Sequence, residues 1–503
     1  MARDTSRTMS VARDPGRIIM SGAKANAAGL LLRLAGRLIF LFVAARLYGV
    51  HLYGAFVVAA ALIELAVSIG SLATKNTLFP LLDRVPLLDR AADSPNRPAV
   101  HIVVDAALLV TLASLLLAAA MAAGALLFAP PDIAAALVLL APMIAGQALL
   151  DLFLAASRWR GKVRYEVVSR SLIEPWFLAA GAIVAFQLGL GASGLAAGYW
   201  CGTLAALVYA ATGVARHYPN IDLRRYRPDR PSLQAILRAA GTNSANDFLN
   251  ALYMRVDLYL VGLLLGPGPT GVYGMARQVT TPIRQVRQSF DGLLVPAVAK
   301  TIGRNGAAGT AEALASAARL ILVIQLPLLI AMLAIGWPLM TWLGPGFEAG
   351  YWALVILGCA EVLQSALGIG DLIFVYLKPR VGLTLTLISI AAGIITALLL
   401  IPRFGITGAA FALLAAYALR SVLRFAVLHS RFGVPVPHAH LAGPLLAAIA
   451  AAGVALAMPS PALAVAVGLG LYAALIAVWL KVTGQSLTLH GFVEEPAAEA
   501  ASG

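Results

Sequence analysis

The chain has 503 residues, of which 60% are hydrophobic and 12% charged, and its formal net charge is +14. An ordinary soluble domain is about 45–50% apolar and about 25% charged, so a soluble protein of this composition could not cover its surface with polar groups. The composition instead predicts a protein whose surroundings are largely lipid. Its basic residues lie between apolar runs and not on one soluble face, which argues against a nucleic-acid partner. Cys201 and Cys359 both lie inside apolar runs, so neither a disulfide framework nor a zinc site is expected.

Taken in chain order, fourteen apolar stretches are each close to the ~20 residues that a helix needs to cross a bilayer. Turn residues separate them, as at Pro130-Pro131 and Gly344-Pro345-Gly346. The stretches run over 28–50, 53–80, 101–128, 133–157, 171–191, 193–215, 236–265, 270–297, 318–343, 350–377, 381–401, 405–428, 441–458 and 461–481. We therefore predict an all-α polytopic membrane protein of about 14 transmembrane helices.

The basic residues predict how the chain is oriented. Most of the 37 Lys and Arg residues fall in alternate connections between the apolar stretches. The other connections hold almost none, with Arg46 and Arg403 as the exceptions. Because positively charged connections stay on the cytoplasmic side, both termini are expected in the cytoplasm, in a multi-pass protein of the bacterial inner membrane.

Two glycine-rich islands indicate an internal repeat. Gly49, Gly54 and Phe56 precede Gly266, Gly271 and Tyr273 by the same interval, and a second set matches at nearly the same offset. That second set pairs Gly191, Ser193 and Gly194 with Gly405, Thr407 and Gly408. Because six helices per repeat is an even number, both repeats should have the same orientation, related by an axis along the membrane normal. The last two helices fall outside the repeat.

The repeat divides the chain into six predicted segments. They are a basic cytoplasmic tail (1–27), a six-helix N-terminal lobe (28–215), a basic cytoplasmic linker (216–235), a six-helix C-terminal lobe (236–428), an extra helical hairpin (441–481) and a cytoplasmic tail (482–503).

Charged residues are concentrated in four of the predicted spans. Charges inside a membrane usually face a cavity or pair with one another. These residues are Arg33 and Arg37 in the first span, Glu64 in the second, Asp247, Arg255 and Asp257 in the seventh, and Arg277, Arg284, Arg287 and Asp291 in the eighth. The third, thirteenth and fourteenth spans are nearly free of charge, and this unevenness favours a polar cavity. Arginine binds phosphate with two hydrogen bonds, so an anion such as a diphosphate is the expected ligand.

Two structural interpretations of these charges stay open. Arg46 and Arg277 lie near span ends, where arginine side chains can extend to the membrane surface. Arg255 could pair with Asp257 or Asp247 and so hold helices together.

Motifs of enzymatic chemistry are absent from the sequence. It contains no Walker loop, no HExxH, no His/Cys cluster and no Gly-x-Ser-x-Gly elbow. We therefore predict no catalytic residues, no cofactor and no metal, and the protein is not expected to be an enzyme.

Three stretches carry a family resemblance. ARLYGVHLYGAF within 43–82 resembles the first hairpin of bacterial polysaccharide flippases, and DLYLVGLLLGPGPTGVYGMARQV, from residue 257, resembles the start of their second half. IPRFGITGAAFA at 401–412 looks like the junction of their eleventh and twelfth helices. These flippases belong to the multidrug/oligosaccharidyl-lipid/polysaccharide exporter (MOP) superfamily. The similarity covers most of residues 25–430.

The resemblance implies two six-helix lobes that work by alternating access. It implies as substrate an undecaprenyl-diphosphate-linked oligosaccharide, an O-antigen or exopolysaccharide repeat unit, whose diphosphate would be held by cavity arginines. The matching positions here are Arg33, Arg37, Arg255, Arg284 and Arg287. Glu64, Asp247 and Asp257 are the carboxylates expected to couple transport to an ion. Membrane lipids, a polysaccharide polymerase and glycosyltransferases are the expected partners.

Three alternative functions stay open on the sequence. A lipid II flippase also tends to have fourteen helices and a cationic cavity. A cation-coupled multidrug exporter of the same superfamily favours carboxylates over arginines. A membrane-embedded glycosyltransferase or polymerase would need a large outside catalytic loop, and the longest such loop expected here has only about ten residues.

Overall fold

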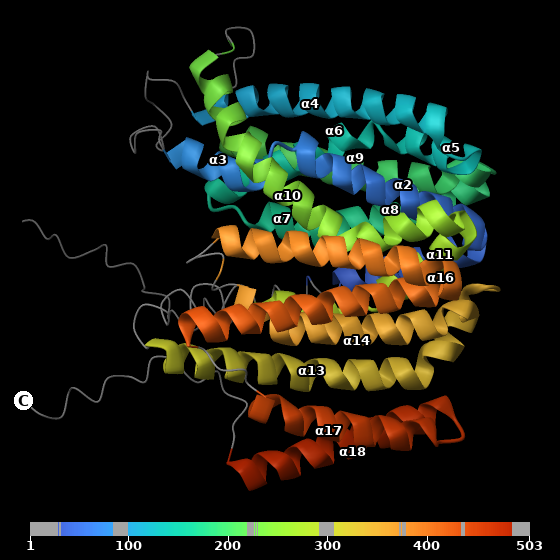
Figure 1. The fold of residues 1–503 in the computed structure, drawn as a ribbon. Coiled ribbons are helices and arrows are strands. Elements are labelled where there is room, and N and C mark those ends of the chain that lie inside the picture. Colours follow the sequence, from blue (N-terminus) through green and yellow to red (C-terminus); the bar gives the residue numbers. More distant parts are fainter. Residues whose placement is uncertain are drawn as a thin grey trace, which may run out of the picture. The chain divides into compact units, whose positions relative to one another are not determined.

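The computed structural model describes residues 29, 32–83, 99–218, 226, 228, 230–290, 306–371, 374, 379–433 and 438–484. Regular elements within these ranges are all helical, which confirms the predicted all-α class (Figure 1). The predicted tail 1–27 lies outside these ranges, as do most of the linker 216–235 and of the tail 482–503.

Ten helices of the described ranges are long and apolar enough to cross a membrane. Leu32–Gly70 overlaps the first two predicted spans, and Arg380–Arg431 contains the eleventh and twelfth. The eighth and thirteenth predicted spans correspond to the helices over 267–290 and to the shorter apolar helix Leu441–Leu456. The polytopic architecture predicted from the sequence is therefore confirmed.

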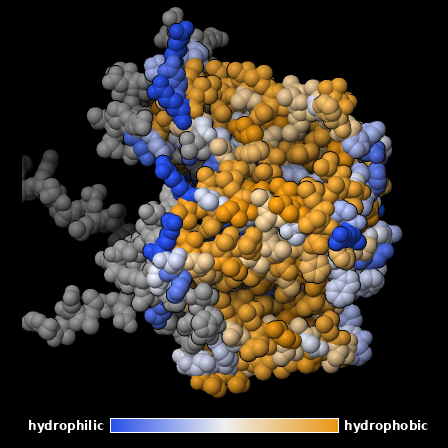
Figure 2. Space-filling view, viewed as in Figure 1, coloured by the Kyte–Doolittle hydropathy of each residue, from blue (hydrophilic) through white to orange (hydrophobic). Residues whose placement is uncertain are grey.

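The helices expose hydrophobic residues along their length. Figure 2 shows them covering most of the visible face, with hydrophilic residues gathered toward the helix ends. Leu116, Leu127 and Ile395 are among the exposed large side chains. An apolar surface of this extent is stable in lipid and not in water.

The chain divides into two compact units. The first unit comprises residues 1–47 and 63–248, and the second comprises residues 48–62 and 249–503. The short segment 48–62 thus belongs to the second unit, although the sequence places it within the predicted N-terminal lobe. The predicted domain boundaries stay a prediction.

The first unit begins with helical residues 32–43, and its elements follow in chain order. They are η1 (Ala44–Tyr48), α2 (Gly49–Gly70), α3 (Thr74–Asp83), α4 (Ala99–Phe128), α5 (Pro131–Leu140), α6 (Met143–Trp159), α7 (Arg164–Val168), η3 (Ser169–Ile173), α8 (Glu174–Gln187), η4 (Gly191–Ser193), α9 (Gly194–His217) and the start of α10 (Arg230–Leu265). Tyr48 and the first part of α2 belong to the second unit.

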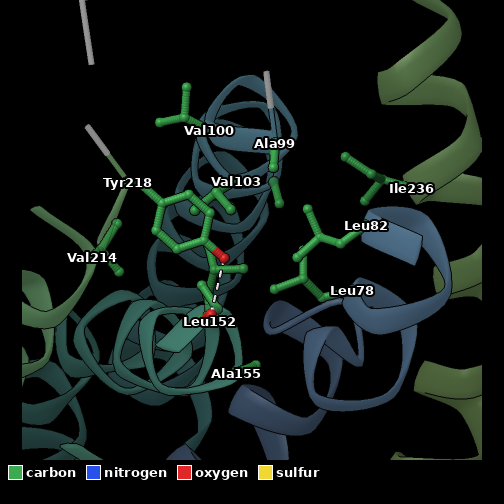
Figure 3. Packing of buried hydrophobic residues seen from close by; sticks show 12 residues of the cluster. Leu78, Leu82, Ala99, Val100, Val103, Leu152, Ala155, Val214, Tyr218 and Ile236 are labelled. Atoms are coloured by element: carbon green, nitrogen blue, oxygen red, sulfur yellow. Dashed lines mark hydrogen bonds between the residues drawn. The ribbon is translucent and has the colours of Figure 1, made fainter. Parts of the chain in front are cut away.

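A buried apolar cluster holds one end of the first unit together (Figure 3). Leu78 and Leu82 of α3 pack with Val103 of α4 and Leu152 of α6. The Tyr218 hydroxyl, after the end of α9, donates to the Ala156 carbonyl at 2.9 Å. These contacts fix α3 against α4 and α6, and that packing positions the charged side chains described below.

The second unit contains the remaining helices. They are the rest of α10, α11 (Pro267–Val279), helical residues 281–290, α13 (Gly306–Leu343), η5 (Phe347–Gly350), α14 (Tyr351–Leu367), η6 (Gly368–Gly370), α16 (Pro379–Phe432), α17 (His438–Leu456) and α18 (Pro461–Thr483). α16 is two antiparallel helices joined at Gly405, whose backbone is not helical. A Cβ on Gly408 would lie 2.3 Å from the Leu400 carbonyl, so the two halves meet directly after the turn.

The glycines that reveal the repeat share a backbone role. Gly49 and its partner Gly266 have φ of 73° and 81°, and Gly191 and its partner Gly405 have φ of 51° and 58°. Glycine adopts this left-handed region without steric cost. The repeated glycines therefore mark equivalent turns between helices.

A second matched pair packs two helices together. A Cβ on Gly54 would lie 1.8 Å from the Pro267 carbonyl oxygen, and one on Gly271 would lie 2.2 Å from the Val50 carbonyl oxygen. The first turns of α2 and α11 thus approach closely within the second unit. This contact explains why segment 48–62 belongs to that unit.

Candidate functional site

The first unit holds a charged network centred on Arg170 of η3. Its guanidinium donates to Glu174 of α8 at 2.7 Å, to the Gln147 amide oxygen of α6 at 3.3 Å, and to Asp151. The other oxygen of Asp151 pairs with Lys75 of α3 at 2.9 Å. Gln147 donates to Glu174 at 3.2 Å and to Thr203 of α9 at 2.9 Å. Five elements therefore bring their polar side chains to one place inside an apolar bundle.

The predicted arginines of the first span lie beside this network. Arg33 is within electrostatic range of Glu174 and Arg170, and Arg37 is within range of Glu174. The Nε of Arg33 is buried and makes no hydrogen bond to the part of the chain that the structure describes. Asp247 of α10 also lies within range of Lys75 and Asp151. The structure thus brings Arg33, Arg37 and Asp247 to the same region of the first unit.

The predicted arginines of the eighth span contact α14 in the second unit. Arg284 pairs with Glu361 at 3.1 Å, and Arg287 donates to the Gln364 carbonyl at 3.3 Å. Glu361 is buried with an exposed fraction of 2%, whereas the Arg284 side chain keeps 30% of its surface exposed. A further hydrogen-bond acceptor can therefore reach Arg284, whereas Glu361 is enclosed.

Asp257 and Arg277 form a buried pair. The Asp257 carboxylate accepts from Arg277 and from the Tyr273 hydroxyl, and Arg277 also donates to the Met254 carbonyl. Arg277 is 9% exposed, so the interpretation that it extends to the membrane surface is wrong. The physical reason is that a buried carboxylate 20 residues earlier satisfies it. A small cavity borders Asp257 and Tyr253 on one side and Ser389 and Gly393 on the other.

Two further arginines hold the end of α14 in place. Arg424 bonds both oxygens of Asp371, at 2.7 and 2.9 Å, and the Leu367 carbonyl at 2.9 Å. Arg420 reaches the same carboxylate at 3.2 Å and lies over the Tyr253 ring. Arg424, which lies within the predicted span 405–428, is fully buried.

The remaining predicted residues are Glu64 and Arg255. Glu64 lies on an exposed face of α2, and Arg255 is half-buried on α10. Both make interactions with their surroundings.

Sequence reasoning missed most partners of the predicted arginines. Asp151 and Gln147 are four residues apart in an apolar run, and so are Arg170 and Glu174. This spacing puts each pair on one helix face and was a usable signal. Arg170 directly precedes the predicted span 171–191, and the structure places it within the helical segment η3. No group of three or more potential metal ligands occurs among the described residues.

Comparisons with known proteins agree with this architecture. Residues 103–344 match the family model described as polysaccharide biosynthesis protein. The probable low-salt glycan biosynthesis flippase Agl15 of Haloferax volcanii is 21% identical over 304 residues, or 60% of this chain and 63% of that flippase. The match thus spans slightly less than two thirds of that relative.

Solved structures share the fold. A lipid II flippase, MurJ, in an inward closed conformation gives a TM-score of 0.75 at 12% identity, covering 93% of this chain and 100% of that one. An inward-facing multidrug resistance MATE family transporter of the MOP superfamily gives 0.58 at 16% identity, covering 82% and 98%. The family model and Agl15 confirm the resemblance to polysaccharide flippases that the sequence indicated, and the solved structures show a shared fold.

Proposed function

We propose that this protein, which resembles the polysaccharide flippases and has the fold of the MOP superfamily, translocates an undecaprenyl-diphosphate-linked oligosaccharide across the bacterial inner membrane. The relative and the family model that match its sequence concern glycan biosynthesis. Alternating access moves the head group, and both termini stay in the cytoplasm. A polysaccharide polymerase and glycosyltransferases that handle the same substrate are the protein partners that we propose.

The observation that carries this proposal is the sign of the charge inside each unit. In the first unit Arg33, Arg37, Lys75 and Arg170 face Asp151, Glu174 and Asp247. In the second unit, the ion pairs and hydrogen bonds described above involve five arginines and three carboxylates of the described residues. They are Arg277, Arg284, Arg287, Arg420 and Arg424 against Asp257, Glu361 and Asp371. An excess of cations supports an anionic substrate and disfavours the export of cationic drugs.

Arg33, Arg37, Arg255, Arg284 and Arg287 are the residues that we assign to the diphosphate. Each charge-assisted hydrogen bond to a phosphate oxygen contributes about 1.5–3 kcal/mol. Arg284 and Arg287 both act as hydrogen-bond donors in the structure, because each donates to an oxygen atom on α14. A substrate phosphate would be a further acceptor of the same kind.

Ion coupling is assigned to Glu64, Asp247 and Asp257. The inside-negative potential favours outward movement of an anionic head group by about 2.3 kcal/mol per charge per 100 mV, so an ion is needed mainly to reset the empty carrier. Transport that survives both the collapse of all ion gradients and neutralisation of all three carboxylates would contradict this role. Because Asp257 pairs with Arg277, its neutralisation can also destabilise the protein. Transport by the Asp257 variant is therefore compared with the wild type at equal amounts of folded protein.

The test is translocation in proteoliposomes that contain the full chain. An undecaprenyl-diphosphate-linked oligosaccharide is loaded in one leaflet, and its exposure to an impermeant glycan-cleaving enzyme is followed. Lipid II and a cationic dye serve as the competing substrates. Lipid II also carries a diphosphate, and a lipid II flippase has a matching fold, so exclusive movement of lipid II would favour the alternative function, a lipid II flippase. Movement of the dye alone, or of none of the three, would overturn the proposal.

A further inference from the structure

Asp151 stands between two cations inside the first unit. One carboxylate oxygen contacts Arg170 and the other contacts Lys75, while Glu174 holds a second nitrogen of Arg170. The Asp151 side chain is 6% exposed, but those of Arg170 and Lys75 are 22% and 53% exposed. The cations can thus be reached from outside the network, whereas the carboxylate between them is enclosed.

The span that carries Lys75 is interrupted directly before it. Leu72 and Ala73 have φ of 51° and 49°, a region that side chains other than glycine rarely adopt. α2 ends at Gly70, and α3 begins at Thr74, whose hydroxyl is buried and makes no hydrogen bond within the described chain. In membrane transporters such interrupted helices commonly contribute to binding sites. Lys75 lies in the first turn of α3, where helix N–H groups also favour an anion.

We infer that Lys75 and Arg170 form a further subsite for the substrate diphosphate, which Asp151 and Glu174 occupy when no substrate is bound. This inference rests on the proposed function. A diphosphate that links a lipid to a sugar carries two non-bridging oxygens on each phosphorus, so it can take the place of both carboxylates toward the fork of Arg170 and the ammonium of Lys75. Arg33 and Arg37, which lie beside Glu174, complete the cationic surroundings.

Exchange of this kind limits how tightly the substrate binds. When phosphate takes the cations, Asp151 loses both partners in an enclosed position, and Asp247 lies within range as a second negative charge. An unpaired buried carboxylate is costly, so part of the binding energy is lost again and the diphosphate can be released. Loss of the contact between Lys75 and Asp151 also removes an ion pair that ties α3 to α6.

The direct test removes the competing charge. The full chain is placed in nanodiscs, and binding of undecaprenyl diphosphate is titrated. We expect Asp151→Asn to bind this lipid about tenfold more tightly than the wild type and to translocate more slowly. Arg170→Gln should bind at least tenfold more weakly, with Arg170→Lys in between. Asp83→Asn is the matched control, because it also removes a carboxylate of this unit, one that accepts from the Trp159 indole at 3.0 Å, and it should bind like the wild type.

The outcomes separate the two proposals. A wild type that does not bind undecaprenyl diphosphate contradicts the proposed function itself. A wild type that binds, with an Asp151→Asn variant that folds and binds equally or more weakly, overturns the exchange and leaves the function standing. If Asp151→Asn does not fold, Glu174→Gln replaces it, since this side chain is 25% exposed, and the same tightening is expected.

Discussion

At the scale of single residues, variants of Arg284 and its partner Glu361 distinguish an effect on substrate binding from an effect on stability. Glu361 is buried, so Arg284→Gln leaves an unpaired carboxylate as well as removing a phosphate donor. We expect Arg284→Gln to weaken diphosphate-lipid binding about tenfold or more, which corresponds to at least ~1.4 kcal/mol, and to lower the melting temperature. Lysine should rescue only in part because it lacks the planar fork.

The double variant Arg284→Gln/Glu361→Gln is the control for this prediction. It removes both charges, so the melting temperature should return toward that of the wild type while binding stays weak. A double variant that regains both properties would show that Arg284 serves only to neutralise Glu361.

Arg33→Gln, Arg37→Gln and Arg287→Gln should complement a flippase-deficient strain poorly at normal expression.

Asp371 supports a second residue-scale prediction, on stability. Breaking a buried ion pair costs on the order of 3 kcal/mol because one charge stays buried without a partner. Asp371→Asn should therefore lower the melting temperature in detergent by several degrees, since Arg424 is fully buried against it. Arg403→Gln removes an exposed arginine of α16, from its first half. This variant should differ from the wild type by no more than about 0.5 kcal/mol in the free energy of unfolding. Equal melting of both variants would contradict this account.

At the scale of helices, the contact between α2 and α11 depends on two glycines. A methyl group at Gly271 would overlap the Val50 carbonyl, and backbone atoms cannot rotate away as a side chain can. We expect Gly271→Ala to destabilise the protein by about 1–3 kcal/mol, measured as a loss of monodisperse protein after heating. Gly268→Ala, in the same helix, has open space around it and should be tolerated. Normal heat resistance of Gly271→Ala would mean that the two helices do not need this close approach.

At the scale of the whole molecule, the distribution of basic residues predicts membrane topology. In a background of Cys201→Ser and Cys359→Ser, Lys162→Cys should be protected from an impermeant maleimide in intact cells. Ala192→Cys, in the turn on the opposite side, should be labelled. Both positions are exposed, so accessibility differs only by the side of the membrane. The reverse labelling pattern would invert the topology. The predicted cytoplasmic connection 84–97 lies outside the described residues.

The sequence alone determined the all-α polytopic class of this protein, the position of its long apolar helices and the glycines at its turns. Apolar runs of bilayer length have one stable outcome in lipid, and glycine is the residue that tolerates the left-handed backbone at Gly49, Gly266 and Gly405. Both signals are local, so they can be interpreted without knowing which helices are neighbours. The predicted concentration of arginines in the first and eighth spans is likewise a property of the chain itself.

Only the tertiary structure decided which charges meet. Arg284 and Glu361 are 77 residues apart, and Gln147 and Thr203 are 56 apart. Helix rotation and packing bring them together, and neither leaves a pattern in one sequence. The sequence therefore did not indicate that Asp151 pairs with Arg170 and Lys75, and Arg277 looked like a residue near a span end. The cost of an unpaired charge in an apolar bundle is what places them against Asp151 and Asp257.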